Sequence, residues 1–586
     1  MSLSSADRLY SLLPAFYLQD DARQGQPLRA LMAVLQSMLD QLESNAEDLY
    51  DDWFIETCSP WVVPYIGELL GVQGLTDAGS NTAGQRARVA NTLAYRRRKG
   101  TAATLQRAVQ DATNWHVHVA PFARLLIRSQ NVKHVLSREG RSVDVRDVAA
   151  LRELGGPFES LAHRVDVRRG GRYSIASVGL FVWRLPSFSV DYSGPPAPAG
   201  PFPDDFTFHP FGLDVPLFST SARAVTRTAF AADLADFRQR HAGDANPPAS
   251  SRYCGAGRAL AVTRDGQAIG PLQVMSADLD WTTAQDHTVS WPGPEVQPPI
   301  DLAVDVERGR MLFRTPPTAD MGVHFTYASG GDLGGGPYDR TASLAEGPAY
   351  DFDVSVGPSS QCTYTSLAAG LAAWSALVNQ TSQLAGRIRL YGGGVFQSAE
   401  VELPERGSLS IEAGNHETAF ILGDISIQGR ASGLGDDATR TLSLNGLVVN
   451  GQLALQRALT LRVLHTTLLP NAESITWTTD SAQPDLDSVN LDVTIERSLV
   501  GSIRLPPISR GCTILNSIVD GRGSQAAFAI AGSAAESRTG PPAALAGVTL
   551  FGQVSALQLR ASRNVIFVDQ VVVQETQVGG ITYSYV

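Results

Sequence analysis

A group of carboxylates lies near the C-terminal end of the chain, in the stretch PDLDSVNLDVTIE, which contains Asp485, Asp487, Asp492 and Glu496. Glycoside hydrolysis requires two carboxyl groups about 5–10 Å apart across a groove. Asp485 and Asp487 are two residues apart and would share one face of a strand. They precede the predicted strand, however, beside Ser and Pro, where solvated loop acids are expected. We therefore predict that the protein is not an enzyme.

His116 and His118, in the stretch NWHVHVAP, alternate along a predicted strand, so that both imidazoles could point to one side. Two such imidazoles are half of a tetrahedral metal site. No carboxylate or cysteine stands at a ligand spacing from them, which favours two polar positions on a half-exposed strand. The glycines at 334–336 lack the Lys-Ser/Thr of a phosphate-binding loop. The sequence therefore predicts neither a metal nor a cofactor.

Four consecutive cations, Arg96, Arg97, Arg98 and Lys99, stand in a chain whose formal net charge is -11. A nucleic-acid site would have to overcome the field of an acidic protein. Residues 83–98 instead read as a helix with Val89, Ala90, Leu93 and Tyr95 toward the core. The cations then fall in its last turn, at the negative end of the helix dipole. Gly100 would end this helix and Thr101 would cap the next one. Arginines at such a corner also suit carboxylates of another subunit.

These residues require helices to position them, and the first part of the chain supplies one. In Pro27–Leu49, apolar residues recur at steps of three and four, which predicts one stripe of an amphipathic helix. The members of the stripe that we assign to a subunit interface are Leu31, Leu35, Met38 and Leu42, together with Tyr95 and Arg96–Lys99. The next stretch, DDWFIETCSPWVVPYIGELLGV, is rich in aromatic residues and reads as a buried corner between short helices.

The rest of the chain reads as β-structure. Gly171–Val190 has the composition of strands, and Ile300–Arg314 alternates as a hairpin does. After about residue 350, short aliphatic strands recur with Gly-containing turns, anchored on Leu447, Leu468, Leu499, Ile518, Leu550 and Ile566. Such a repeat favours a right-handed parallel β-solenoid, with a β-sandwich as the alternative. The helix predicted in Leu367–Gln380 would cap the open end of the solenoid.

The composition fits this architecture. Of 586 residues, 43% are hydrophobic and 18% charged, which is typical of a globular chain, and 54 Gly with 33 Pro indicate many turns. We predict a multidomain α+β protein with a helical bundle domain at 1–120, a β-rich middle at 121–350 and the solenoid at 351–586. The four cysteines form no redox or metal motif, and no segment is long and apolar enough to span a membrane. The N-terminus shows no secretion signal, so we expect assembly in the cytoplasm.

The stretches WFIETCSPWVVPYIGELLGV and YRRRKGTAATLQRAV, together with the opening DRLYSLLPAFYLQDD, resemble the phage tail protein I family. GRYSIASVGLFVWRL and DLGGGPYDR also resemble a long-chain subgroup from bacterial injection-system gene clusters. The first resemblance covers about residues 1–120. It implies a baseplate wedge component of contractile tails, whose helical domain bundles with neighbouring wedge subunits in the ring around the spike. The chain departs from short family members by its long β-rich continuation.

From this resemblance we expect a structural wedge subunit of a contractile injection system or phage-like particle. Its expected partners are other wedge proteins, and through them the sheath, tube and spike; the C-terminal domain would contact a fibre or a target surface. We expect no nucleic acid as a partner. A carbohydrate-binding or carbohydrate-cleaving β-helix protein is the alternative. The chain ends in the strand-like ITYSYV, so the question of an extension beyond Val586 stays open.

Overall fold

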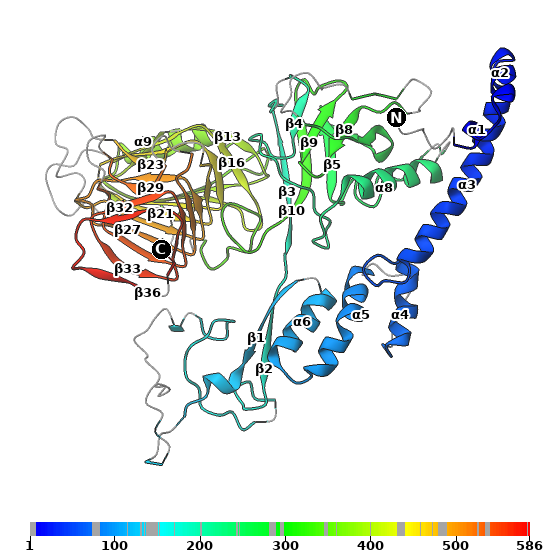
Figure 1. Ribbon diagram of the computed structural model, residues 1–586. Helices are drawn as coiled ribbons and strands as arrows, with labels where there is room; N and C mark the ends of the chain where they lie inside the picture. The colour runs from blue at the N-terminus through cyan, green and yellow to red at the C-terminus, as the bar shows by residue number, and fades with distance from the viewer. Residues whose placement is uncertain are drawn as a thin grey trace. The chain divides into compact units, whose positions relative to one another are not determined.

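The computed structural model divides into two compact units, Met1–Arg184 and Leu185–Val586, which we describe separately (Figure 1). It describes residues 8–72, 82–113, 115–128, 132–133, 135, 150–151, 153–168, 170–199, 202–241, 244, 246–280, 289–292, 298–344, 350–358, 360–398, 400–429, 440–457, 459–470, 473–478, 489–523, 527–533, 539–582 and 584–585. The mixed α+β class predicted from the sequence is confirmed: helices dominate the start of the chain and long parallel sheets its end.

Helices make up most of the described part of the first unit. They are α1 (Arg8–Ser11), α2 (Ala15–Arg23), α3 (Pro27–Asp51), η2 (Pro60–Val62), α4 (Val63–Leu69), α5 (Thr82–Arg97) and α6 (Ala102–Thr113). A short hairpin follows, in which β1 (His116–Pro121) pairs antiparallel with β2 (Val178–Trp183), with η3 (Phe122–Leu125) directly after β1. α6 packs on both α5 and β1, so these two helices and the hairpin form one layered body, while α1 and α2 pack on α3.

The long helix α3 matches the predicted amphipathic helix, and its start is fixed by a buried carboxylate. Asp21 is only 5% exposed and accepts hydrogen bonds from the Leu28 and Arg29 backbone amides at 2.6 and 3.2 Å and from the Tyr10 hydroxyl at 2.8 Å. These donors include backbone amides that a helix N-terminus leaves without partners. Burial alone would raise the pKa of Asp21, but the hydrogen bonds outweigh it and lower that pKa.

The second unit begins with two four-stranded sheets that share a core. One has the order β3-β10-β5-β6 and the other β4-β9-β8-β7. The elements are β3 (Ser187–Gly194), β4 (Asp205–Thr207), α8 (Arg227–Arg240), β5 (Leu260–Arg264), β6 (Gln267–Ile269), η4 (Pro271–Gln273), β7 (Val274–Ser276), β8 (Leu302–Asp305), β9 (Arg310–Phe313) and β10 (Met321–Ala328). β8 and β9 pair antiparallel, which confirms the predicted hairpin in Ile300–Arg314.

A parallel solenoid of three sheets fills the rest of the second unit (Figure 1). The ten-stranded sheet contains β11 (Phe352–Val356), β12 (Gln383–Leu390), β15 (Arg406–Ala413), β18 (Arg440–Asn445), β21 (Thr460–Leu464), β24 (Asp492–Glu496), β27 (Gly511–Leu515), β30 (Ala543–Ala546), β33 (Leu559–Arg563) and β36 (Gly579–Thr582). One buried column runs through it, formed by Ile388, Ile411, Leu444, Val463, Ile495, Ile514 and Leu545.

The other two sheets have eight strands each. The first contains β13 (Val395–Gln397), β16 (Ala419–Leu422), β19 (Leu447–Asn450), β22 (Thr467–Leu468), β25 (Leu499–Val500), β28 (Ile518–Asp520), β31 (Thr549–Phe551) and β34 (Ile566–Phe567). The second contains β14 (Glu400–Leu403), β17 (Ile425–Gly429), β20 (Leu453–Gln456), β23 (Glu473–Trp477), β26 (Ser502–Arg504), β29 (Phe528–Ala531), β32 (Gln553–Ala556) and β35 (Val571–Val573). The six residues that anchor the predicted repeat all lie in the eight-stranded sheet that begins with β13. Each lies in a different strand: β19, β22, β25, β28, β31 and β34.

The repeat in the sequence follows from one backbone conformation that recurs from coil to coil of the solenoid. Directly after six strands of the ten-stranded sheet, the chain turns through a residue with φ between 42° and 76°: Gly446, His465, Arg497, Asn516, Gly547 and Asn564. Their residue numbers differ by 19, 32, 19, 31 and 17, by subtraction, so each marks one coil, and the long steps carry inserted loops. Only Gly adopts this conformation without strain, and Asn tolerates it better than most side chains.

Helix α9 (Leu367–Val378) packs on β11, β12, β13 and β14, the first strands of the three sheets, and so confirms the predicted cap. Its Trp374 is fully buried and donates from Nε1 to the Glu402 carbonyl oxygen at 2.7 Å. Gly386 lies directly under the Trp374 ring, where an added Cβ would stand 2.2 Å from a ring carbon. A bare backbone at Gly386 therefore allows the indole to close the end of the core.

Candidate interaction surface

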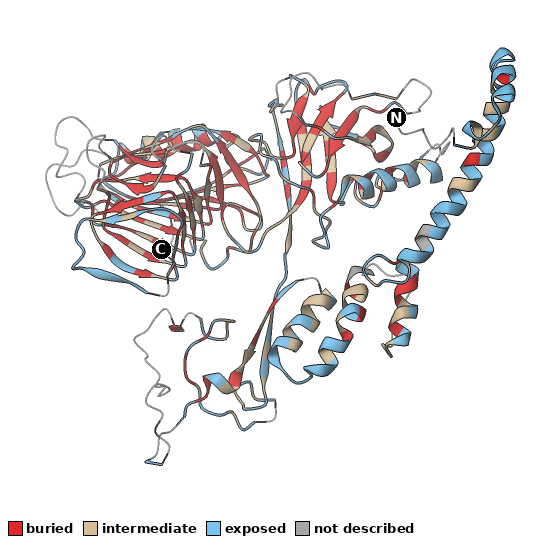
Figure 2. Cartoon of the chain, in the orientation of Figure 1, coloured by how far each residue is buried: buried red, intermediate tan, exposed pale blue. Residues whose placement is uncertain are grey.

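Helix α3 presents different surfaces on two sides. On one side, the backbone amide of Leu9 donates to Gln36 Oε1 at 3.0 Å, and Gln36 is 0% exposed because α1 and α2 cover it. Arg8 of α1 also forms an ion pair with Glu43 of α3, with a distance of 3.0 Å between Nη1 and Oε2. The N-terminal helices therefore occupy only one face of α3 and leave the neighbouring face open, as the exposed colouring of this helix indicates (Figure 2).

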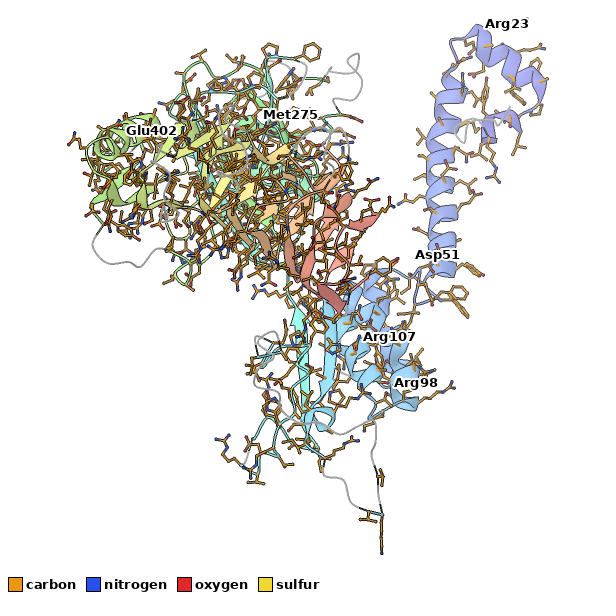
Figure 3. All side chains as sticks on the ribbon, turned by 90° about the vertical axis from the view of Figure 1, so that its left-hand side faces the viewer. Arg23, Asp51, Arg98, Arg107, Met275 and Glu402 are labelled. Carbon is orange, nitrogen blue, oxygen red and sulfur yellow. The ribbon has the colours of Figure 1, made fainter. Side chains whose placement is uncertain are left out.

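The open face carries the predicted apolar residues. Leu31, Leu35, Met38 and Leu42 are 55%, 44%, 62% and 66% exposed, and Leu49 farther along is 65% exposed. In Figure 3, Arg23 labels the end of α2 and Asp51 the end of α3, and side chains project along the whole length of α3. Large apolar side chains lined up in water along one helix are characteristic of an interaction site.

The spacing of this surface is more regular than the sequence pattern first suggests. Residues 28, 31, 35, 38, 42, 45 and 49 follow steps of three and four in strict alternation, and all but one are apolar: Leu28, Leu31, Leu35, Met38, Leu42, Asn45 and Leu49. Leu28 is half-exposed and the other six are exposed. Met32 and Leu39, which also belong to the predicted stripe, are half-exposed. We call these seven residues the α3 seam. A 3–4 alternation is the pattern of a coiled-coil contact line, with Asn45 as a single polar core position.

An aromatic surface follows the seam in sequence. Trp53, Trp61 and Tyr65 are 83%, 58% and 60% exposed, and Leu69 is also exposed. The expectation of a fully buried corner in this stretch is therefore wrong for its aromatic residues. Its short helices are present, but the small core beneath them is formed by Cys58, Val62, Val63 and Val89 and includes none of these rings.

The α5–α6 corner has the predicted helix, stop and start. Gly100 has φ +91°, and Thr101 Oγ1 accepts from the Thr104 backbone amide at 3.3 Å. Val89 is fully buried, as predicted, whereas Ala90 is exposed and Leu93 is 53% exposed, so the assignment of these two to the core is wrong. Leu93 stands on a turn of α5 that none of the described neighbouring helices covers.

The residues at the end of α5 fall into two groups: some form hydrogen bonds within the chain, and the others are exposed to solvent. The side chain of Tyr95 is half-buried, and its hydroxyl donates to Asp111 Oδ2 on α6, while Asn91 Nδ2 donates to the same oxygen at 2.7 Å. Burial, followed by the contact with Asp111, raises the pKa of Tyr95. Arg96 donates to the Gly71 carbonyl oxygen at 3.1 Å. Arg97, Arg98 and Lys99 are exposed, and within the described residues no ion pair joins them to a carboxylate (Figure 3 labels Arg98).

The remaining candidates do not assemble into a reactive site. His118 packs near the rings of Phe158 and Trp183, at 5.7 and 6.3 Å between centroids, and His116 is exposed on the same strand. No group of three metal-ligating side chains occurs in the described part of the chain, and all four cysteines are free thiols. Asp485 and Asp487 lie outside the described residues, while Asp492 and Glu496 are half-exposed on β24. None of the helices that the structure describes could cross a membrane.

Residues 25–152 match the family described as phage tail protein (Tail_P2_I). The match includes the α3 seam, the aromatic surface and the α5–α6 corner; it starts after the opening stretch at 7–21 and continues beyond residue 120. It confirms the resemblance found in the sequence and supports a structural role in a phage tail. No curated protein and no solved structure matches the chain.

Proposed function

We propose, from the premise that residues 25–152 carry a phage tail protein domain, that the protein is a baseplate wedge subunit of a contractile injection system or phage-like particle. The α3 seam supports this assignment most strongly. A stable monomer has no need for a row of leucines in water, whereas a helix of a ring assembly must keep one face open for its neighbours.

The seam suits a helix from another wedge subunit as its partner. Burying one Leu or Met side chain stabilises an association by roughly 1.5–3 kcal/mol. The six apolar positions along α3 are already partly covered in the free chain, so burying the remainder supplies a free energy of the same order as the loss of freedom on association, which costs about 4–15 kcal/mol. Asn45 would fix the register of the bundle, since one polar core residue commonly selects one alignment.

The charges of the α5–α6 corner also support a contact with another subunit. Arg97, Arg98 and Lys99 are exposed at the C-terminal end of α5, in a chain with a net charge of -11. Copies of this protein therefore repel one another at long range but present a local cationic patch to acidic residues of a different subunit. Bidentate pairing of Arg97 or Arg98 with a partner carboxylate would orient the helical hairpin.

The remaining assignments follow from this role. The partners are other wedge proteins, and through them the sheath, tube and spike; assembly takes place in the cytoplasm before any release of the particle. We retain the division into a wedge domain at 1–120, a β-rich middle at 121–350 and a β-helix domain at 351–586, the last two forming a peripheral arm that contacts a fibre or a target surface. No catalytic role is proposed.

Co-expression with the large wedge protein of the same gene cluster tests the assignment. Met38→Glu with Leu42→Glu places two charges in the seam, and we expect recovery of the complex by affinity purification to fall at least tenfold, because a buried unpaired carboxylate costs several kcal/mol. The matched control is Ser37→Glu with Ser44→Glu, two exposed positions on the same helix outside the seam, which should leave recovery unchanged.

Two results would contradict the proposal. One is a complex that forms equally well with the Met38→Glu, Leu42→Glu chain. The other is a wild-type chain that stays monomeric with every wedge protein of its cluster while its seam is protected from hydrogen exchange, since the seam would then be covered within one molecule.

A further inference from the structure

A groove of about 500 Å³ lies on the outer face of the ten-stranded sheet, bounded on one side by the segment Asp339–Leu344 and by Tyr350. Its floor comes from β15, β18, β21 and β24, which are neighbours in this sheet. Adjacent strands are about 4.8 Å apart, so the floor is about 14 Å wide across these four strands. Its volume falls within the range of about 300–1,000 Å³ that is common for small-ligand sites.

Parallel register gives this floor an ordered set of hydroxyl groups. Ser408 pairs with Thr441, and Ser410 pairs with Ser443, so that four hydroxyls stand in two rows on neighbouring strands. The row of Ser410 and Ser443 continues to Arg462 on β21. Each hydroxyl can both donate and accept a hydrogen bond. The floor is therefore chemically suited to a ligand that itself carries many hydroxyl groups.

The guanidinium groups on the floor are available to a ligand. Arg462 and Arg497 are exposed, and in the described part of the chain neither side chain forms an ion pair. Farther along the same sheet, Arg387 pairs with Asp353 and Arg389 with Glu412 at 2.9 Å, so those cations are already neutralised. Arg387 and Arg389 are thus paired outside the groove, whereas Arg462 and Arg497 are open within it.

The wall of the groove contains buried polar atoms without partners. Arg340 is 1% exposed; its Nη2 donates to the carbonyl oxygens of Gly414 and Glu417, but Nε and Nη1 have no hydrogen-bond partner. His465, 4% exposed, has an unpartnered Nδ1. Buried groups of this kind are normally satisfied, and both residues line the groove. The wall of the groove therefore adds polar side chains to the hydroxyl rows of its floor.

We propose that this groove binds an acidic oligosaccharide, a chain of sugar rings carrying carboxylate groups, with Arg462 and Arg497 on the carboxylates and the Ser and Thr rows on the sugar hydroxyls. Carboxylates match the planar fork of arginine. Tyr350 closes one end of the groove, and its ring already packs against the guanidinium of Arg387, 4.7 Å from the ring centroid. The inference concerns the β-helix and is independent of the wedge role of the α3 seam.

Other macromolecules fit the groove less well. Nucleic acid requires a basic stripe or interleaved aromatic rings, whereas the three arginines here, Arg340, Arg462 and Arg497, share the groove with Asp339 and Glu496. An extended peptide would add to a free strand edge, but the floor consists of internal strands whose main-chain groups are already paired. A ligand that carries both hydroxyl and carboxylate groups would contact the Ser and Thr hydroxyls as well as the arginine guanidinium groups of the groove.

Isothermal titration of the full chain with hexagalacturonate, oligoalginate, a hyaluronate hexasaccharide and oligosialic acid tests this proposal. We expect binding of at least one of these probes, a tenfold or greater loss of affinity for Arg462→Gln, and a comparable loss when the carboxylates of the bound probe are methyl-esterified. Arg510→Gln, an exposed arginine of the same domain outside the groove, should bind as the wild type does. Thermal unfolding of each variant verifies that the fold is intact.

Absence of binding to all four probes would overturn the proposal. So would equal binding of Arg462→Gln, or equal affinity for the methyl-esterified probe. Tighter binding of a single-stranded DNA oligonucleotide or of polyglutamate, tested alongside, would reassign the groove to polyanions in general and also refute it.

Discussion

At the scale of single residues, the solenoid depends on one backbone conformation repeated after six strands of the ten-stranded sheet. Two of the six residues that adopt it are Gly and two are Asn, while His465 and Arg497 adopt it at a cost in strain. Both exceptions line the groove described above. If the groove binds a ligand as proposed above, these two side chains would be kept at the turn for binding rather than for conformation.

Asn516 offers a direct test of this conformational requirement. Its φ is 46° at the turn between β27 and β28. Asn516→Val should lower the free energy of unfolding by about 1–3 kcal/mol, because a β-branched residue is strained in the left-handed region. Asn516→Gly should change it by a few tenths of a kcal/mol at most. Urea unfolding followed by circular dichroism measures the difference; equal losses for Val and Gly would refute this explanation.

At the scale of elements, sequence periodicity predicted which helices exist but not which faces are covered. The stripe on α3 was read as one surface, yet α1 and α2 divide it and leave the α3 seam open. Leu93 on α5 was assigned to the core for the same reason, because its spacing from Val89 fits a buried face. Periodicity identifies an apolar face; the number of neighbours that pack on it is decided by the rest of the fold.

The cap helix α9 allows a prediction at this scale. Trp374→Ala removes a fully buried indole and leaves a cavity next to Gly386, which should destabilise the N-terminal end of the solenoid by about 3–5 kcal/mol. Hydrogen exchange in β11 and β12 should then accelerate more than in β30, far along the sheet. Ala372→Ser, an exposed position on α9, is the control and should change neither. Uniform acceleration along the whole solenoid would contradict a local capping role.

At the scale of the second unit, the two small sheets and the solenoid share apolar residues in one core. Phe420 of β16 and Val448 of β19 belong to the same cluster as residues of β3, β9 and β10. His209 packs beside Phe420, with ring centroids 5.3 Å apart, and its Nδ1 accepts a hydrogen bond from the Phe211 backbone amide at 3.2 Å. A neutral imidazole is thus part of the contact between these halves.

This contact should weaken in mild acid. Burial lowers the pKa of His209 from 6.5 to about 4, so the unfolded chain takes up a proton at a higher pH than the folded one. The stabilisation is complete above about pH 6.5 and is lost as the pH falls toward about 4, by up to about 3 kcal/mol. The unfolding temperature should therefore fall less between about pH 7 and pH 4.5 in His209→Gln than in the wild type.

The control for this prediction is His416→Asn, at an exposed position in the solenoid, which should keep the pH dependence of the wild type. A His209→Gln chain whose unfolding temperature falls by as much as that of the wild type would show that other groups cause the acid sensitivity.

The sequence by itself determined the helix of Pro27–Leu49, the Gly100 stop with its Thr101 start, the hairpin at Ile300–Arg314 and the parallel repeat, because each depends on local periodicity or on one special backbone conformation. It also carried the family resemblance that the match over 25–152 confirms. Only the tertiary structure decided that α1 and α2 cover one side of α3, that the aromatic residues around Trp53 and Trp61 are exposed, and that Ser410, Ser443 and Arg462 stand in one row. Those facts depend on contacts between residues far apart in the chain, and the spacing of residues within one segment contains no information about what packs against it.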